Sequence, residues 1–208
     1  MKQIFDPMMD NLDANGFAVV DGFIDTQSVN QLLHNASVAL QQGGFRDAGI
    51  GRQTDHHTNK SIRSDQVMWM TQQTILNWCP QLSSHLNALV DYLNQTCYAG
   101  INHSEFHMAH YGPGAFYKRH VDQFRKNGDR RFTVIVYLNL NWQPLDGGQL
   151  MVYPPDGPHE VVPKAGRLVF FESGVLEHEV MLSKNSRWSF TGWLKNVRIP
   201  QMPCSTNY

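Results

Sequence analysis

The chain has 208 residues, which fits one domain with enough length to bury a single substantial core. Its 17 Lys and Arg and 18 Asp and Glu give a formal net charge of -1, and the basic residues are scattered, which argues against a nucleic acid or an anionic membrane as a partner. The sequence starts without the apolar stretch of a signal peptide and contains no run of about eighteen apolar residues, so we expect a cytoplasmic protein.

The first half of the chain predicts helices separated by short strands. Apolar residues recur at helical spacing in the longer segments, and glycines or a proline stand where helices would end or begin. The expected elements are a helix over residues 6–15, a strand over 17–20, a helix from Asp25 and Thr26 to about Gln42, a strand over 62–69, and a helix from just after Pro80 through Leu93.

A polar segment over residues 46–60 interrupts this pattern with Gly, Asp, Thr, His and Asn and few apolar side chains. Loops of this length in compact domains are often functional. We expect the segment to be flexible when free and to close over a proline-containing stretch of a partner protein. His56 and His57 are expected to be solvated, because adjacent side chains on an extended chain face opposite ways and no carboxylate lies at matching spacing.

Beyond about Ala99, short β-prone runs alternate with Gly, Pro, Asn and Asp turns. The expected strands cover residues 105–111, 117–122, 132–138, 149–153, 167–171, 178–182 and 187–194, and His159, among prolines, is expected in a turn. Seven or eight such strands suit a jelly roll. The expected fold class is mainly β with N-terminal helices (α+β), a single domain over 1–208 in which helical support over about 1–98 braces a double-stranded β-helix over about 99–198.

One stretch carries the chemistry, because His120 and Asp122 stand two residues apart and would face the same side of a strand. A third candidate ligand, His178, lies far downstream, and Arg187 follows it by nine residues. Two imidazoles and one carboxylate leave metal positions open, which is the ligand set of non-haem Fe(II) enzymes. A cation beyond the third ligand can hold an acidic cosubstrate.

Further motifs occur in a matching order: Tyr111-Gly112-Pro113-Gly114, Tyr117 to Asp122, Tyr137-Leu138-Asn139, Gly147-Gly148-Gln149-Leu150, His178-Glu179-Val180 and Arg187 to Trp193. With them, the sequence resembles a prolyl 4-hydroxylase of the Fe(II)/2-oxoglutarate dioxygenase superfamily, of the hypoxia-sensing prolyl hydroxylase type and its bacterial counterparts. The segment Ile62-Arg63-Ser64-Asp65 also resembles the segment that precedes the core in this group. The ordered set is far more specific than His-x-Asp alone.

The resemblance implies a role for each matching residue. The implied metal ligands are His120, Asp122 and His178, the implied cosubstrate-binding residues are Arg187, Tyr137, Thr191, Tyr111, Leu150 and Val180, and the implied substrate-binding residues are Arg130, Trp193, Arg63 and Asp65. The planar fork of Arg187 suits a two-pronged salt bridge to the distal carboxylate of 2-oxoglutarate better than a lysine would.

The implied activity is hydroxylation of a prolyl residue in a protein substrate, with Fe(II) as metal, 2-oxoglutarate and O2 as cosubstrates, ascorbate (vitamin C) as reductant, and succinate and CO2 as products. The resemblance also implies oxygen sensing, and for bacterial members it points to elongation factor Tu as the partner. A monomer is the expected oligomeric state. The iron and the cosubstrate carry the chemistry, so no general base or protein nucleophile is needed.

Two other hypotheses stay open. The same iron chemistry could act on a small molecule or another side chain, or the protein could be a non-enzymatic cupin-like module in which the same ligands hold zinc or a structural ion. Arg187 with Tyr137 argues against the module, because a structural metal has no use for a buried cation prepared for a dicarboxylate. The match over residues 46–65 favours prolyl substrates. His107 and His110 could compete as ligands, and we interpret them as packing or surface residues.

Overall fold

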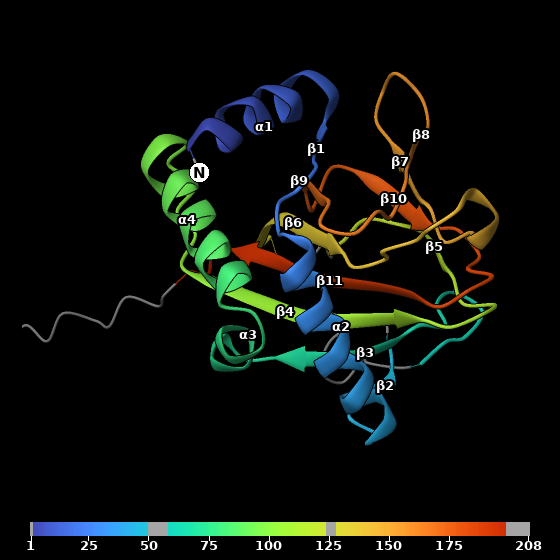
Figure 1. The fold of residues 1–208 in the computed structure, drawn as a ribbon. Helices are drawn as coiled ribbons and strands as arrows, with labels where there is room; N and C mark the ends of the chain where they lie inside the picture. The colour runs from blue at the N-terminus through green and yellow to red at the C-terminus, as the bar shows by residue number, and fades with distance from the viewer. Residues whose placement is uncertain (1, 50–57, 124–127, 199–208) are drawn as a thin grey trace, which may run out of the picture.

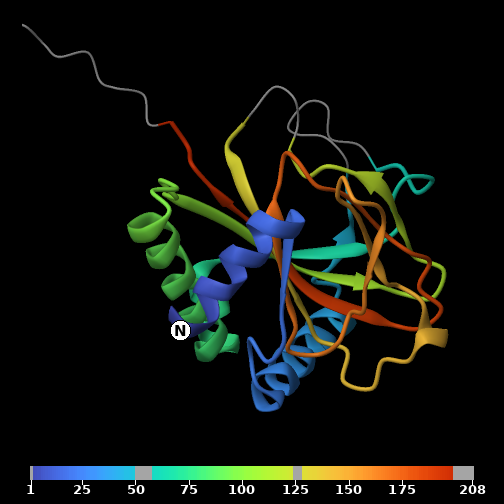
Figure 2. The same ribbon diagram turned by 90° about the horizontal axis from the view of Figure 1, so that it is seen from above.

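The computed structural model describes residues 2–49, 58–123 and 128–198, and within these ranges two β-sheets face each other with helices on one side (Figures 1 and 2). The helices are α1 (Lys2–Asn15), α2 (Thr26–Gln41), α3 (Gln72–Trp78) and α4 (Pro80–Thr96), with a short 3-10 helix, η2, at Pro144–Asp146. The strands are β1 (Phe17–Val20), β2 (Arg46–Asp47), β3 (Gln66–Met70), β4 (His103–Tyr111), β5 (Tyr117–His120), β6 (Arg130–Tyr137), β7 (Leu150–Tyr153), β8 (His159–Val161), β9 (Leu168–Glu172), β10 (Glu177–Val180) and β11 (Arg187–Lys195).

The sheets are antiparallel throughout the described ranges. The larger sheet has seven strands in the order β1-β9-β6-β11-β4-β3-β2, and the smaller has four in the order β5-β10-β7-β8. Two facing antiparallel sheets of this kind form a jelly roll, so the expected fold class is confirmed. The first half of the chain supplies β1, β2 and β3 to the larger sheet, so the limit near residue 98 does not separate a helical part from a β part.

The two long helices begin and pack as their sequences predict. Asp25 caps α2 by accepting a hydrogen bond from the backbone N–H of Ser28 at 2.7 Å, and Pro80 occupies the first turn of α4. Both helices bury a stripe of apolar side chains, for example Leu32 in α2 and Leu89 in α4, each with 0% exposure. Most of their stability therefore comes from packing of the apolar stripe, as in most helices of globular proteins.

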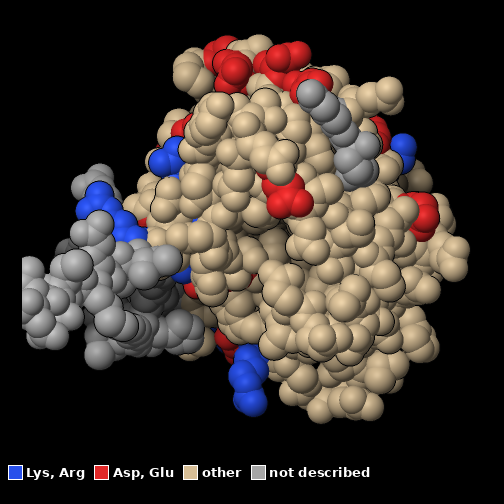
Figure 3. Space-filling view, turned by 90° about the vertical axis from the view of Figure 1, so that its left-hand side faces the viewer, with Lys and Arg blue, Asp and Glu red and all other residues tan. Residues whose placement is uncertain are grey.

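Three of the helices, α2, α3 and α4, carry few charged side chains. Within α2, α3 and α4, Asp91 is the one residue among Asp, Glu, Lys and Arg. Figure 3 shows the side of the molecule that lies on the left of Figure 1, with carboxylates gathered at the top and few charges below them. None of the helices in the described ranges has the length and apolar character needed to cross a bilayer.

Three short elements differ from the sequence-based predictions. Residues 72–78 form α3, capped by Thr71 and burying Ile75, where no helix was expected. His159 was expected in a turn and this was wrong, since it lies in β8 and pairs with Val152 of β7. The start of the polar segment forms β2 against β3. His56 and His57 lie outside the described residues, as does most of the segment expected to close over a partner.

Side chains along β11 point alternately into the hydrophobic core and into the pocket. Phe190 is fully buried and stacks on Phe106 of β4 with 5.0 Å between ring centroids. Successive side chains of a strand point to opposite faces, so Ser189 and Thr191 lie on the other face, where both line the pocket described below. One strand therefore contributes both to the hydrophobic core and to the site.

Candidate active site

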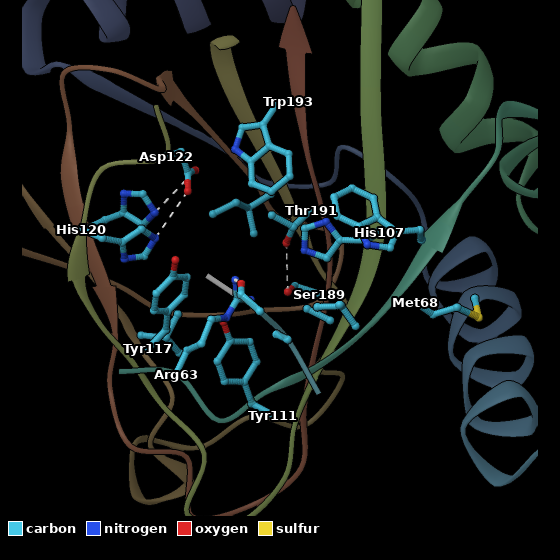
Figure 4. Close-up of a pocket in the computed structure, with 18 of the residues that line it drawn as sticks. Arg63, Met68, His107, Tyr111, Tyr117, His120, Asp122, Ser189, Thr191 and Trp193 are labelled. Atoms are coloured by element: carbon cyan, nitrogen blue, oxygen red, sulfur yellow. Dashed lines mark hydrogen bonds and ion pairs between the residues drawn. The ribbon is translucent and has the colours of Figure 1, made fainter. Parts of the chain in front are cut away.

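His120, Asp122 and His178 meet between the two sheets, with one ligand atom from each lying within 4.8 Å of the others (Figure 4). His120 ends β5 and His178 lies in β10, and the two residues are direct partners across these strands. The expectation that Asp122 continues the same strand was wrong, because β5 ends at His120. The chain after the strand nevertheless returns the Asp122 carboxylate to the two imidazoles, at 3.4 Å and 3.7 Å from their Nε2 atoms.

The backbone determines which nitrogen of each imidazole is available. Nδ1 of His120 donates to the carbonyl oxygen of Lys118 at 2.7 Å, and Nδ1 of His178 donates to that of Leu176 at 3.1 Å. Both Nε2 atoms are thereby left facing the carboxylate. Nε2 of His120 is buried and has no hydrogen-bond partner among the described residues. This arrangement of backbone carbonyls behind the rings is typical of metal-binding histidines.

The carboxylate is held in its charged form. Burial alone would raise the pKa of Asp122, but the nearby His178 and His120 outweigh it and bring the pKa below its usual range. The hydroxyl of Thr133 in β6 donates to Oδ2 of Asp122 at 2.8 Å. Burial lowers the pKa of His178 to about 4, so its ring is neutral near pH 7. An ionised carboxylate and neutral imidazole are the protonation states that bind a divalent metal, and the cluster fits Fe(II).

A pocket of about 600 Å³ opens beside the cluster and is lined from both sheets. Figure 4 shows polar and aromatic side chains from β4, β5 and β11 around it. The expected site residues that line it are His120, Asp122, His178, Arg187, Thr191, Tyr111, Leu150, Val180, Arg130, Trp193 and Arg63. Tyr137 and Asp65 are fully or almost fully buried and lie behind the lining residues, against Arg187 and Arg63 respectively.

Arg187 is a buried cation at the start of β11, and it lines the pocket. It is 3% exposed, and its Nε donates to the carbonyl oxygen of Gly148 at 2.8 Å. Its guanidinium lies over the rings of Tyr111 and Tyr137, at 4.7 Å and 5.0 Å from their centroids. No Asp or Glu in the described parts of the chain forms an ion pair with it. A buried charge without a counter-ion costs several kcal/mol, so this site favours an anionic ligand.

Hydroxyl groups accompany this cation. The hydroxyl of Tyr137 is buried and has no hydrogen-bond partner in the described ranges. Thr191 donates to the hydroxyl of Ser189 at 3.2 Å, and the Nη1 of Arg187 reaches the same Ser189 oxygen at 3.4 Å. The dashed line in Figure 4 marks the contact between Thr191 and Ser189. Donors thus converge around a place that a carboxylate would fill.

The mouth of the pocket is aromatic and cationic. The Arg130 guanidinium lies 3.4 Å from the ring centroid of Trp193 and donates to the backbone oxygen of Asp122 at 2.8 Å. Trp69 is 58% exposed, and its ring centroid lies 6.1 Å from that of Trp193. Arg63 also lines the pocket, but its fork is bound to Asp65 by two hydrogen bonds of 2.8 Å and 2.6 Å.

His107 lines the pocket, although the sequence pointed only to a packing or surface role. Neither His107 nor His110 belongs to the metal cluster, as expected, but His107 lines the pocket and contacts the rings of Trp69 and Trp193 at 5.0 Å and 5.4 Å. Burial lowers its pKa to about 4, so the ring is neutral. The register of β4 against β11, which places His107 opposite Thr191, is the signal that identifies it, and a single sequence does not supply that register.

Comparisons with known proteins agree with this geometry. A family model described as the 2OG-Fe(II) oxygenase superfamily matches residues 106–195. The chain is 30% identical over 205 residues to the hypoxia-inducible factor prolyl hydroxylase of Caenorhabditis elegans, covering 93% of this chain but only 28% of that protein.

Solved structures match over nearly the whole chain. The crystal structure of a Pseudomonas putida prolyl-4-hydroxylase has a TM-score of 0.83 and 34% identity, covering 93% of this chain and 99% of that one. A second similar structure is a Trichoplax adhaerens prolyl hydroxylase in complex with a hypoxia inducible factor oxygen degradation domain peptide fragment. It has a TM-score of 0.83 and 26% identity, and the match covers 94% of this chain and 90% of that one. On its sequence, fold and site together, the chain belongs to the prolyl hydroxylases of the 2OG-Fe(II) oxygenase superfamily.

Proposed function

We propose that this chain is an Fe(II)- and 2-oxoglutarate-dependent dioxygenase that hydroxylates a prolyl residue in a protein substrate. One observation carries the proposal: a cluster of two imidazoles and a carboxylate shares a single pocket with Arg187, a buried cation that has no carboxylate partner among the described residues. A structural metal site would have no need of that cation. A metal enzyme with a dicarboxylate cosubstrate needs both.

His120, Asp122 and His178 would hold the iron, which with O2 and 2-oxoglutarate supplies the oxidising chemistry and yields succinate and CO2. The contribution of the chain is orientation and protection. Thr133 holds the Asp122 carboxylate, and the carbonyl groups behind both imidazoles keep Nε2 free for the metal. Ascorbate is the reductant in this proposal.

Arg187 would bind the distal carboxylate of 2-oxoglutarate through its planar fork, with the Tyr137 and Thr191 hydroxyls as further donors. Tyr111 would lie beside the cosubstrate between Arg187 and the metal, since its ring contacts the guanidinium. Leu150 and Val180 line the same pocket and would exclude water from the reacting atoms.

The substrate side would use the mouth of the pocket. Arg130, Trp193, Arg63 and its partner Asp65 are the residues we assign to it, because the first three line the pocket and Asp65 orients Arg63. A protein substrate is supported by the similar Trichoplax adhaerens structure, whose ligand is a peptide. Elongation factor Tu is the partner we propose to test first.

The test reconstitutes the purified protein with Fe(II) and 2-oxoglutarate without oxygen, then admits oxygen with candidate substrates. Elongation factor Tu, a hypoxia inducible factor peptide and a fractionated lysate form the panel, and succinate and modified proline are measured. Succinate that rises with a protein substrate, together with hydroxyproline in it, supports the proposal. If only small molecules in the lysate stimulated succinate formation, the enzyme would act on a small molecule and not on a protein. Metal binding without any succinate formation would indicate a non-enzymatic structural module.

A further inference from the structure

The ring of Tyr117 lies flat against the His120 imidazole. Their centroids are 3.6 Å apart and the rings are 17° from parallel, the tightest aromatic contact found in the described ranges. Tyr117 opens β5 and His120 closes it, so the same short strand carries the metal ligand and the ring that covers one of its faces. Figure 4 shows both side chains on the same side of the pocket.

Tyr117 is itself held by a charged pair. The Arg63 guanidinium lies 4.2 Å from the centroid of the Tyr117 ring, and Asp65 fixes that guanidinium through two hydrogen bonds. Asp65 is 1% exposed and the Arg63 side chain 12%, and the Nη1 of Arg63 also reaches the carbonyl oxygen of Gly49 at 3.4 Å. Arg63, Tyr117 and His120 therefore form a continuous contact series, with Asp65 as its anchor.

The backbone supports the same contact. β5 is an edge strand of the smaller sheet, and residues 62–64, which precede β3, pair with its free side. Arg63 forms an antiparallel bridge with Tyr117, the N–H of Lys118 donates to the carbonyl oxygen of Ile62 at 2.9 Å, and that of Ser64 donates to Phe116 at 3.1 Å. The segment therefore closes the edge that carries the ligand.

A metal-binding imidazole must be constrained in two ways. The hydrogen bond from Nδ1 to Lys118 fixes one edge of the His120 ring, but the ring can still tilt about that bond. A flat aromatic contact on its face removes the remaining freedom. Groups behind a metal ligand act on affinity by holding the ligand in position, and their loss typically weakens metal binding by about 10- to 100-fold.

We propose that Tyr117 is a positioning residue for the metal ligand His120, and that Arg63 and Asp65 act on the metal site by holding Tyr117. The inference rests on the proposed function, since it requires that the cluster binds a metal. It assigns Arg63 and Asp65 a task in addition to substrate contact. It also makes residues 62–65, directly before β3, part of the metal site.

The test measures Mn(II) affinity in the absence of turnover, by electron paramagnetic resonance of the free ion. Tyr117→Leu, which removes the flat ring, should weaken Mn(II) binding about tenfold or more. Tyr117→Phe keeps the ring and should bind close to the parent affinity. The double variant Arg63→Met with Asp65→Asn removes the anchor without leaving a buried unpaired charge, and it should weaken binding in the same direction by a smaller factor.

Arg119→Met is the matched control. The Arg119 guanidinium also lies over a tyrosine ring, 3.8 Å from the centroid of Tyr153, and comes from the same strand, but it pairs with Glu177 and is half-exposed away from the ligands. Because Arg119 is not among the residues that line the pocket, its loss should leave Mn(II) affinity unchanged. An effect in Arg119→Met as large as in Tyr117→Leu would indicate general damage to β5 and would overturn the assignment.

The outcomes separate the two claims. Failure of the parent protein to bind Mn(II) would refute the proposed function. Parent-like affinity in Tyr117→Leu, with the parent binding normally, would refute the inference alone. Circular dichroism shows whether Tyr117→Leu is folded. If Tyr117→Leu is unfolded, the double variant Arg63→Met with Asp65→Asn provides the test. Unchanged Mn(II) affinity in that variant would refute the role of Arg63 and Asp65 in the metal site.

Discussion

At the scale of single residues, Arg187 distinguishes this site from a plain metal site. Its charge is buried beside Tyr111 and Tyr137, and the structure gives it backbone and hydroxyl partners but no carboxylate within the described ranges. The buried Tyr137 hydroxyl points to the same conclusion. These groups suit one anionic ligand, and the proposed function assigns this place to the distal carboxylate of 2-oxoglutarate.

Replacing Arg187 by Met should lower the affinity for 2-oxoglutarate at least tenfold. Loss of one partner of a buried, hydrogen-bonded charge pair costs on the order of 2 to 5 kcal/mol. Calorimetric titration of 2-oxoglutarate into the anaerobic Fe(II) protein measures the effect, with Mn(II) affinity as the check that the cluster is intact. Arg187→Lys should recover little of the loss, and parent-like binding by this variant would show that a point charge suffices without the fork.

His107 should contribute a pH dependence to stability. Burial lowers its pKa from 6.5 to about 4 in the folded protein, so between these pH values the unfolded chain binds more protons. The free energy of unfolding should therefore fall as the pH falls from 6.5 to 4, by about 3 kcal/mol from this residue. Urea titrations across this range should show a shallower decline in His107→Leu. An unchanged slope would mean that His107 is protonated normally in the folded state.

At the scale of elements, β11 supplies four of the residues that line the pocket. Arg187, Ser189, Thr191 and Trp193 alternate with core residues along it, in register with β4 on one side and β6 on the other. Gly192 lies opposite Phe106 of β4, and a Cβ atom added to it would overlap the carbonyl oxygen of Glu105 and the ring of Phe106. The neighbours are backbone and a stacked ring, so they have little room to yield.

Gly192→Ala should therefore destabilise the fold by about 3 kcal/mol or more, as expected for overpacking at a site that cannot relax. Gly112→Ala is the matched control, since its Cβ would meet only His110 at 3.8 Å, an ordinary contact. Denaturant unfolding of both variants gives the comparison. Equal stability of the two variants would show that β11 can shift, and with it the positions of Arg187 and Thr191.

Elements with a long repeating pattern could be predicted from the sequence. The leucine spacing and caps of α2 and α4 determine those helices locally, and the strands of the second half were found within a few residues of their expected ends. α3 and β8 escaped prediction because each is short. α3 buries one side chain, Ile75, and β8 exists through its pairing with β7 rather than through a pattern of its own.

At the scale of the whole molecule, the site depends on contacts between distant segments. Sequence motifs identified the three candidate ligands and Arg187, because their order along the chain is specific. They did not identify the stack of Tyr117 on His120, the bond from Thr133 to Asp122 or the pocket position of His107. Those relations follow from strand register and from the folding of β5 against the segment before β3, which a single sequence does not specify.

Metal and cosubstrate should stabilise the whole fold, because the cluster draws ligands from both β5 and β10 and the cosubstrate would bridge to β11. A ligand at 100 times its dissociation constant stabilises by about 2.7 kcal/mol, which for a domain of this length raises Tm by about 5 to 10 °C. Anaerobic thermal scans with Fe(II), then with added 2-oxoglutarate, should show two successive increases. A chelator should reverse both, and the second should be absent in Arg187→Met.

In the proposed function, oxygen from O2 is inserted into a prolyl residue of a protein while 2-oxoglutarate is converted to succinate. The most direct measurement runs the reaction under isotope-labelled O2 with a substrate protein from the panel and locates the label by peptide mass spectrometry. The expected result is one labelled oxygen on proline and one in succinate, and neither product in Asp122→Ala. Labelled succinate accompanied by unmodified proline, or by label on another residue type, would contradict it.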